Sequence, residues 1–205
     1  MDAFWFPLPA GEGVKSRAAR QAKGLRFMTH EEIYNALHER FGERIVSCSA
    51  TAVDPYIVVD VPVLHDVAYY LRHDPDMQFD SLMCLSGVDY GPEKSLGVVY
   101  NLHSTTLRHK ITLKVEVPRH DGVVPTVCDI WRTAEWHERE AYDLFGMRFE
   151  NHPDRRRILL PDDWEGHPLL KDYQVQEFYH GIKVPYVGDP PSIGMDVYRY
   201  QDSEP

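Results

Sequence analysis

The side chains best suited to chemistry lie in residues 136–161, the stretch WHEREAYDLFGMRFENHPDRRRILLP. Imidazole and carboxylate groups spaced three residues apart share one face of a helix, where they can hold a metal ion or transfer a proton. His137, Glu140 and Asp143 have this spacing. A metal or acid–base site on these three residues is therefore one hypothesis.

The more specific catalytic patterns do not occur in the chain. His137 and Glu138 begin like the zinc motif HExxH, but Ala141 occupies the position of the second histidine. The sequence contains no GxSxG nucleophile motif, no phosphate-binding Walker loop and no GxGxxG dinucleotide motif. Neighbouring carboxylates on one helix also face each other poorly across a cleft, as a glycosidase pair must. We therefore assign no catalytic residue.

Three cysteines are spread widely and form no CxxC pair: Cys48, Cys84 and Cys128. A zinc site or an iron–sulfur cluster built within this chain needs closely spaced ligands. We therefore expect buried reduced thiols, and no metal-binding or cofactor-binding residue.

A structural interpretation explains the same stretch without catalysis. The predicted helix carries an apolar stripe, and Glu138 falls on that stripe, where a charge must be paired or hydrogen-bonded. Glu135, Arg139 and Asp143 are spaced to form an i, i+4 ladder. After Gly146 and a turn, residues 155–157 supply three arginines. We expect these arginines to brace the acidic helix, directly or through a second protein. The stripe consists of Ile130, Trp131, Ala134, Ala141, Tyr142 and Phe145.

Regular elements are predicted on both sides of this helix. A capping box, Thr29 with Glu32, begins a helix that ends at Gly42. Residues 44–60 read as one or two strands broken at Asp54–Pro55, and a second helix runs from Val61–Pro62 to about residue 74. Three strands follow within residues 79–90, 97–104 and 110–117, the last two as an antiparallel pair, and a third helix covers residues 127–144.

This order predicts an α+β domain over residues 29–160, with a mixed or antiparallel sheet and helices packed on it. Residues 1–28 are expected to form an N-terminal extended arm. Residues 161–205 contain recurrent prolines among aspartates and tyrosines and show little helical period. We expect them to form an extended C-terminal arm that wraps a partner.

Overall composition narrows the functional class. A formal net charge of −10 argues against a nucleic-acid-binding protein, which needs a basic surface. No apolar run is long enough to span a membrane, and the start MDAFWFPLPAGEG does not resemble a targeting signal. We expect a cytosolic protein that contacts a membrane only through a partner.

The stretch as a whole resembles the signature of a known family. Residues 138–161 are similar, in order and spacing, to the signature of the 30 kDa subunit of proton-translocating NADH:quinone oxidoreductase, respiratory complex I. The signature and expected subunit-interface residues are Glu138, Arg139, Glu140, Asp143, Leu144, Phe145, His152, Arg156, Arg157, Ile158 and Leu159.

The resemblance implies a structural subunit of the peripheral arm with no redox centre of its own. It implies that NADH, FMN, iron–sulfur clusters and quinone are bound by other subunits, while the complex couples electron transfer to proton translocation. The implied partners are the subunit that forms the quinone site and the subunit that holds the last iron–sulfur cluster. The implied location is the cytoplasmic side of the bacterial inner membrane.

Three alternatives remain open from the sequence. The equivalent subunit of a membrane-bound hydrogenase, or of another quinone-reducing complex, shares this kind of segment. A stand-alone metalloenzyme would use His137, Glu140 and Asp143. A free adaptor module would be stable and monodisperse without partners.

Overall fold

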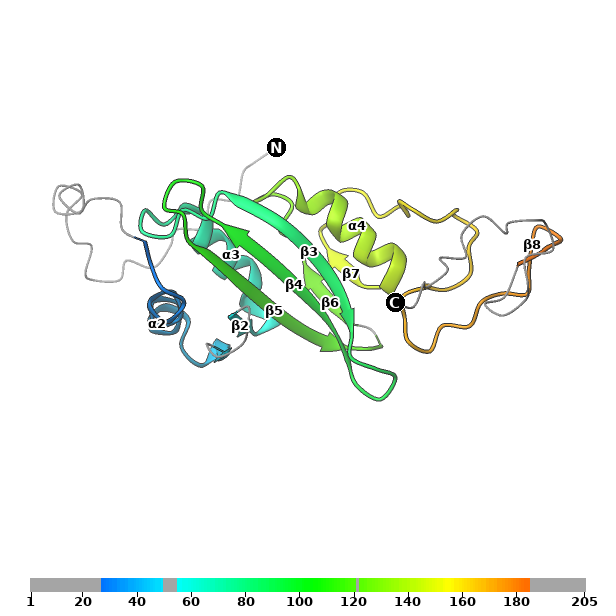
Figure 1. Ribbon diagram of the computed structural model, residues 1–205, viewed down its shortest axis with the longest axis horizontal. Coiled ribbons are helices and arrows are strands. Elements are labelled where there is room, and N and C mark those ends of the chain that lie inside the picture. The colour runs from blue at the N-terminus through cyan, green and yellow to red at the C-terminus, as the bar shows by residue number, and fades with distance from the viewer. Residues whose placement is uncertain (1–26, 50–54, 121, 185–205) are drawn as a thin grey trace, which may run out of the picture.

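The computed structural model describes residues 27–49, 55–120 and 122–184 (Figure 1). The expected N-terminal arm therefore lies almost entirely outside the described residues, as does the last part of the C-terminal arm, residues 185–205.

The first described helix, α2 (His30–Phe41), is determined by its own sequence. The Thr29 hydroxyl accepts a hydrogen bond from the Glu32 backbone N–H at 3.3 Å, and the Glu32 carboxylate accepts one from the Thr29 N–H at 3.0 Å. The predicted capping box is thus confirmed. Ile33 and Leu37, one turn apart, are fully buried, and the helix ends at Gly42 as expected.

A five-stranded mixed sheet forms the centre of the domain, in the order β1-β2-β5-β4-β3. Only the β2–β5 pair in it is parallel, and the other neighbours are antiparallel. The alternation predicted in β5 is confirmed, because Ile111, Leu113, Val115 and Val117 all face the core. The strands are β1 (Ile45–Ser49), β2 (Tyr56–Val59), β3 (Ser81–Asp89), β4 (Ser95–His103) and β5 (Lys110–Pro118).

Helix α3 (Leu64–His73) follows a short 3₁₀ turn, η2 (Val61–Val63), that contains the expected proline. Val67 and Leu71 are fully buried in the same core cluster as the inward face of the sheet. Asp74 is the C-cap, immediately before Pro75, so the predicted end of this helix is confirmed.

Helix α4 (Ala134–Phe145) begins seven residues later than predicted. Residues 127–133 instead make turns, in which the Ile130 and Trp131 N–H groups both donate to the Val127 carbonyl. The chain before them is tied to a short parallel pair that the sequence analysis missed, β6 (Val123–Pro125) with β7 (Arg148–Glu150). The Thr126 N–H donates to the Glu150 carbonyl at 3.0 Å and continues this pairing up to the predicted start of the helix.

After β7 the described chain has little regular structure. Its last elements are the two short strands β8 (Phe178–Tyr179) and β9 (Ile182–Lys183), which pair as a hairpin. In Figure 1 this hairpin lies at the opposite end of the molecule from α2. The α+β class and the mixed sheet are confirmed, whereas the extended arm stays a prediction.

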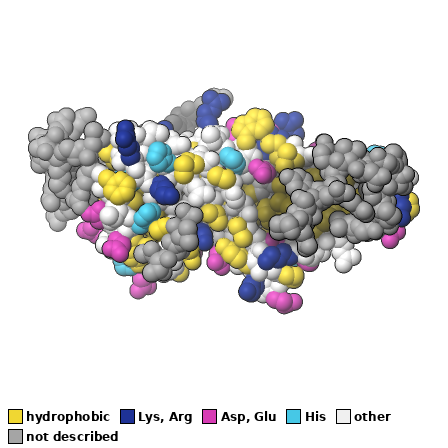
Figure 2. Space-filling model, viewed as in Figure 1, with side chains coloured by type: hydrophobic (Ala, Val, Ile, Leu, Met, Phe, Trp, Pro, Cys, Tyr) yellow, Lys and Arg dark blue, Asp and Glu magenta, His cyan; other side chains and the backbone are white. Residues whose placement is uncertain are grey.

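None of the helices in the described part of the chain is long and apolar enough to cross a membrane. On the described part of the face in Figure 2, lysine and arginine side chains are interspersed with acidic and hydrophobic ones. That distribution differs from the continuous basic surface that a nucleic-acid-binding protein presents.

Candidate functional site

Asp143 is the centre of the predicted site and is fully buried on α4. Its Oδ2 atom accepts hydrogen bonds from three consecutive backbone N–H groups, those of Ile158 (3.1 Å), Leu159 (2.7 Å) and Leu160 (2.9 Å). Its Oδ1 atom accepts one from Arg157 Nη1 at 2.9 Å. Burial raises the pKa of Asp143, but these donors outweigh burial and hold the pKa below its usual value.

Arg157 connects this carboxylate to the chain that follows. Its Nη2 atom donates to the carbonyl oxygens of Trp164 at 3.0 Å and Gly166 at 3.1 Å, while Nη1 holds Asp143. One planar guanidinium therefore joins its own segment to α4 and to residues 164–166, a geometry that a lysine ammonium cannot reproduce. The expected bracing of the acidic helix by an arginine is present within this chain.

The C-terminal end of α4 is held by the same segment. Gly146 has φ = 74°, the left-handed conformation that terminates many helices and that glycine adopts without strain. A Cβ atom there would lie 2.7 Å from the ring of His167, and that ring hydrogen-bonds to the Asp143 carbonyl at 2.8 Å. The Leu169 N–H donates to the Leu144 carbonyl at 3.0 Å. Residues beyond 161 thus complete the helix end.

Glu138 is also fully buried, as its place on the apolar stripe predicted, but its partners are not arginines. Its carboxylate accepts a short hydrogen bond from the Thr126 hydroxyl and a 2.8 Å bond from the Val127 N–H. Burial raises the pKa of Glu138 to about 7, because two neutral donors compensate only part of the lost hydration.

His152 lies beside Glu138 but does not neutralise it. The two side chains approach to 3.9 Å. The His152 Nε2 atom donates to the Glu135 carbonyl at 3.1 Å, and its Nδ1 atom accepts from the Asp154 N–H at 3.0 Å. Both ring nitrogens are therefore used as in a neutral imidazole. His152 serves to connect the turn after β7 to the first turn of α4.

Arg139 holds the other side of that turn. It donates to the carbonyl oxygens of Arg156 (3.1 Å) and Arg157 (2.9 Å), and it lies 3.4 Å from the Asp154 carboxylate. The predicted Glu135–Arg139–Asp143 ladder is wrong, because both Arg139 and Asp143 take their partners from residues 154–160.

The remaining signature residues are more peripheral. Glu140 is 52% exposed, and among the residues that the structure describes it forms an ion-pair contact with His137 alone, at 4.0 Å. Arg156 is 78% exposed and forms two hydrogen bonds with the Asp154 carboxylate, at 3.0 and 2.8 Å. Leu144 and Phe145 are half-buried, and the Phe145 ring lies against β3, where it occupies the space beside Gly87.

The hypothetical metal set does not converge. Asp143 faces the interior with four hydrogen-bond donors, whereas Glu140 is on the exposed side of the helix. Nor does the described part of the chain contain any group of three or more His, Cys, Asp or Glu side chains placed to hold a metal ion. The donor set expected for a metalloenzyme is therefore not assembled here.

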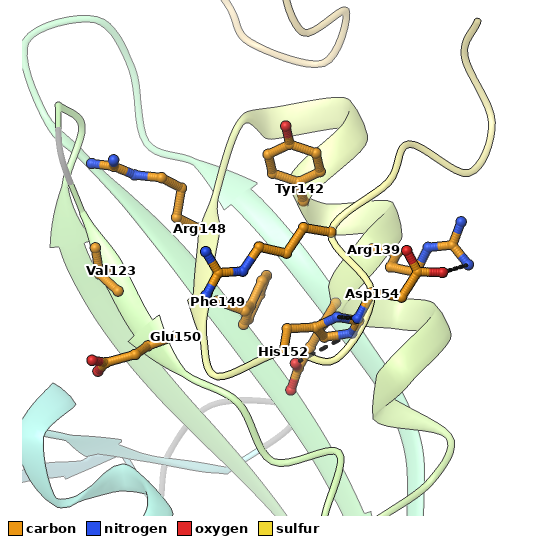
Figure 3. Close-up of a pocket in the computed structure, with 10 residues that line it drawn as sticks. Val123, Arg139, Tyr142, Arg148, Phe149, Glu150, His152 and Asp154 are labelled. Carbon is orange, nitrogen blue, oxygen red and sulfur yellow. Dashed lines mark hydrogen bonds and ion pairs between the residues drawn. The ribbon is translucent and has the colours of Figure 1, made fainter. Parts of the chain in front are cut away.

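A pocket of about 340 Å³ opens between α4 and β7. Figure 3 shows Tyr142 and Arg139 of α4 on one side and Arg148, Phe149 and Glu150 of β7 on the other. Three arginines and three carboxylates line it together with apolar side chains, so the lining has no excess of either charge. The pocket is lined by Val123, Glu138, Arg139, Tyr142, Arg148, Phe149, Glu150, His152, Asp154 and Arg155.

Several residues of the site were not found from the sequence. Thr126, Asp154 and His167 supply hydrogen bonds to the site, but each is distant from its partner in sequence or belongs to no motif. The only sequence signal was the requirement that a buried Glu138 have donors, which does not say where they come from. The site is centred on Asp143, which accepts four hydrogen bonds from Arg157 and residues 158–160 and so holds this stretch on α4; we call this arrangement the clamp.

Comparisons with known proteins relate the chain to one family. The profile of the family described as "Respiratory-chain NADH dehydrogenase, 30 Kd subunit" matches residues 57–179. A protein of Chloroherpeton thalassium, named as a subunit of NADH-quinone oxidoreductase, is 50% identical over 159 residues, which are 77% of this chain and 66% of that protein. A protein of the same name from Chlorobium phaeobacteroides is 50% identical over 155 residues, 75% of this chain and 93% of that protein.

A solved structure shares the fold. A chain in the structure of the membrane-bound sulfane sulfur reductase, an archaeal respiratory membrane complex, superposes with a TM-score of 0.59 at 24% identity. The similarity covers 70% of this chain and 85% of that one. At this level of identity the likeness is one of fold alone.

Proposed function

This chain belongs to the 30 kDa subunit family of the respiratory-chain NADH dehydrogenase, and from that premise we propose that it is a structural subunit of the peripheral arm without a redox centre of its own. It supports electron transfer from NADH to quinone, coupled to proton translocation, while other subunits bind NADH, FMN, iron–sulfur clusters and quinone. It lies at the cytoplasmic side of the bacterial inner membrane and contacts the membrane only through the complex.

The saturation of Asp143 is the observation that carries this proposal. A buried carboxylate that already accepts from three backbone N–H groups and a guanidinium is committed to structural hydrogen bonds and is poorly suited to bind a metal ion or act as a base. Its effect is to fix residues 157–160 against α4. Stoichiometric iron, flavin or zinc in the purified chain would contradict the proposal that the subunit has no cofactor.

The proposed partners are the subunit that forms the quinone site and the subunit that holds the last iron–sulfur cluster. The clamp orients the chain beyond residue 161, which we propose as the partner-binding arm. Prolines and tyrosines in this arm offer large contact area at low entropic cost.

The main alternative is the equivalent subunit of a hydrogenase-type complex. The two relatives described above, each about half identical in sequence, are both named as subunits of NADH-quinone oxidoreductase, which favours the NADH-linked complex. The archaeal structure is similar in fold, but its lower identity supports no choice of electron donor.

The clamp is tested by substituting Arg157. We expect Arg157→Ala to cost about 1–3 kcal/mol, because Asp143 loses its guanidinium donor and the Trp164 and Gly166 carbonyl groups lose theirs, and to lower the amount of intact complex. Arg157→Lys should rescue it only in part. The first readout is the yield of assembled complex, which should fall. The second is the NADH:quinone turnover per assembled complex, which should remain normal.

Arg155→Ala is the matched control, because Arg155 is an exposed neighbour and not part of the clamp. It should leave assembly unchanged. Normal assembly of Arg157→Ala with slow electron transfer would show that the site takes part in turnover and would refute the structural role.

A further inference from the structure

The hairpin near the end of the described chain has a preformed turn. His180 and Gly181, its two central residues, have φ values of 49° and 76°, as a type I′ turn requires. The turn sets the register in which Tyr179 pairs with Ile182 and Phe178 with Lys183. A 2.9 Å hydrogen bond from the Val184 N–H to the Glu177 carbonyl extends the ladder.

The hairpin is also fixed to the chain that precedes it. The Asp163 carboxylate accepts a hydrogen bond from the Tyr179 hydroxyl at 2.9 Å and contacts His180 Nε2 at 2.6 Å. These two bonds lower the pKa of Asp163. The ring of Trp164 lies 5.2 Å from that of Tyr179.

These contacts continue into the buried site. Arg157, which holds Asp143, also holds the carbonyl groups of Trp164 and Gly166. The Trp164 indole N–H in turn donates to the Tyr173 hydroxyl at 3.1 Å. The position of the hairpin is therefore linked through Trp164 and Arg157 to helix α4.

Two large apolar side chains are exposed on this ordered hairpin. Phe178 is 59% exposed and Ile182 is 73% exposed. An isolated two-stranded hairpin is only marginally stable in water, and its exposed apolar groups gain nothing until another surface covers them. Because the turn and the Asp163 contacts order the hairpin beforehand, binding would cost little further entropy.

We propose that this hairpin is the docking element of the arm and inserts into an apolar cleft edged by lysine or arginine on a neighbouring subunit. The register places Phe178 and Ile182 on opposite faces of the hairpin, so each anchor contacts one wall of the cleft. The inference rests on the proposed function and locates the contact within the arm. The basic edge of the cleft is inferred from the acidic composition of residues 161–184. This stretch contains two lysines (Lys171, Lys183) and five acidic residues (Asp162, Asp163, Glu165, Asp172, Glu177).

The test compares variants of the full chain within the assembled complex. Phe178→Ala combined with Ile182→Ala should lower the apparent affinity of the chain for the rest of the complex at least about tenfold. Gly181→Val should weaken binding in the same direction, because both anchors remain but the left-handed turn is disfavoured. Tyr69→Ala is the control, since it removes an aromatic side chain of similar exposure (53%) from α3.

Truncation after Tyr173 separates the two proposals. A truncated chain that assembles fully would overturn the docking hairpin and the part of the arm beyond Tyr173 as an interface. A truncated chain that assembles poorly, beside a double variant that assembles normally, would overturn only the hairpin. Thermal unfolding of the free Phe178→Ala, Ile182→Ala double variant should match that of the unmodified chain, because both anchors are exposed. An altered transition would show that the pair stabilises the chain itself and would refute their assignment as docking anchors.

Discussion

Glu138 and Asp143 are both fully buried on α4, yet their surroundings favour different protonation states. Asp143 receives a guanidinium and three aligned N–H groups, which together hold its pKa below the usual value. Glu138 receives one hydroxyl and one N–H group, and burial raises its pKa to about 7. The nearby carboxylate of Asp129 adds to that shift.

This difference predicts how stability depends on pH. The folded chain binds the Glu138 proton more tightly than the unfolded chain, so its contribution is fully present below a pH of 4.5 and is lost as the pH rises through about 7. Glu138→Gln removes the charge: its amide oxygen can accept from the Val127 N–H, and its NH2 group can donate to the Thr126 hydroxyl oxygen. We expect this variant to be more stable than the unmodified chain above pH 7, by up to about 3 kcal/mol.

Urea unfolding of the purified chain at about pH 5 and about pH 8 measures this effect. The difference between the two chains should be small at the lower pH and large at the higher one. Glu140→Gln, on the exposed side of the same helix, should leave the free energy of unfolding unchanged at both pH values. An equal loss of stability at both pH values for Glu138→Gln would contradict the assignment.

At the residue scale, the sequence predicted which buried side chains require hydrogen bonds, but it did not predict which residues supply them. The apolar stripe required Glu138 to be hydrogen-bonded, and it is. That the donors are Thr126 and Val127 depends on how the chain returns before α4, which no local spacing encodes. The predicted i, i+4 ladder failed because three backbone donors and the Arg157 guanidinium bind the buried Asp143 carboxylate better than one side chain a turn away does.

At the scale of elements, α4 and β3 approach each other closely where a strand residue lacks a side chain. A Cβ atom on Gly87 would lie 2.6 Å from the ring of Phe145. We expect Gly87→Ala to force the helix and strand apart and to destabilise the chain by about 1–3 kcal/mol. Thermal or urea unfolding of the purified chain measures the change.

Combining Gly87→Ala with Phe145→Leu gives the matched control, since the smaller side chain makes room for the added methyl group. Part of the lost stability should return, so the two effects should not be additive. Additive losses would mean that the Phe145 ring can move away and that the contact does not set the position of α4.

Elements with local signals were predicted well. The capping box of α2, the proline before α3 and the alternation in β5 are each contained in a few neighbouring residues. The start of α4 and the β6–β7 pair were not predicted. β6 and β7 have three residues each, and β6 precedes α4 in the chain whereas β7 follows it. Strands this short and this far apart leave no periodic pattern in the sequence.

At the scale of the whole molecule, the first part of the arm is attached to the domain. The Asp89 carboxylate, itself buried, accepts a hydrogen bond from the Lys171 N–H at 2.8 Å. Arg119 forms ion pairs with both Asp89 and Asp172. The region expected to leave the domain at residue 161 therefore remains in contact with it as far as residue 172.

Limited proteolysis of the free chain should reflect these contacts. We expect the first cleavages of the arm on the C-terminal side of Tyr173, with residues 161–172 protected by their anchors. The same sites should be protected in the assembled complex. Arg119→Ala should admit cleavage between residues 161 and 172, because it releases Asp172 and removes a partner of Asp89.

Early cleavage near residue 162 in the unmodified chain would contradict the attachment. Equal cleavage of free chain and complex beyond Tyr173 would count against the arm as an interface. Arg44→Ala, which removes an exposed ion pair with Asp60 far from the arm in sequence, should leave the pattern unchanged.

The parallel pairing of β6 with β7 has a consequence for the order in which the chain can fold during synthesis. The β4–β5 hairpin can form as soon as residue 118 has left the ribosome, since both of its strands are then available. β6 must wait until residues 148–150 have been made and α4 has crossed between the strands. Closing such a crossover is slower than closing a hairpin. The clamp, and with it the surface offered to partners, is therefore completed late, after the sheet already exists to receive it.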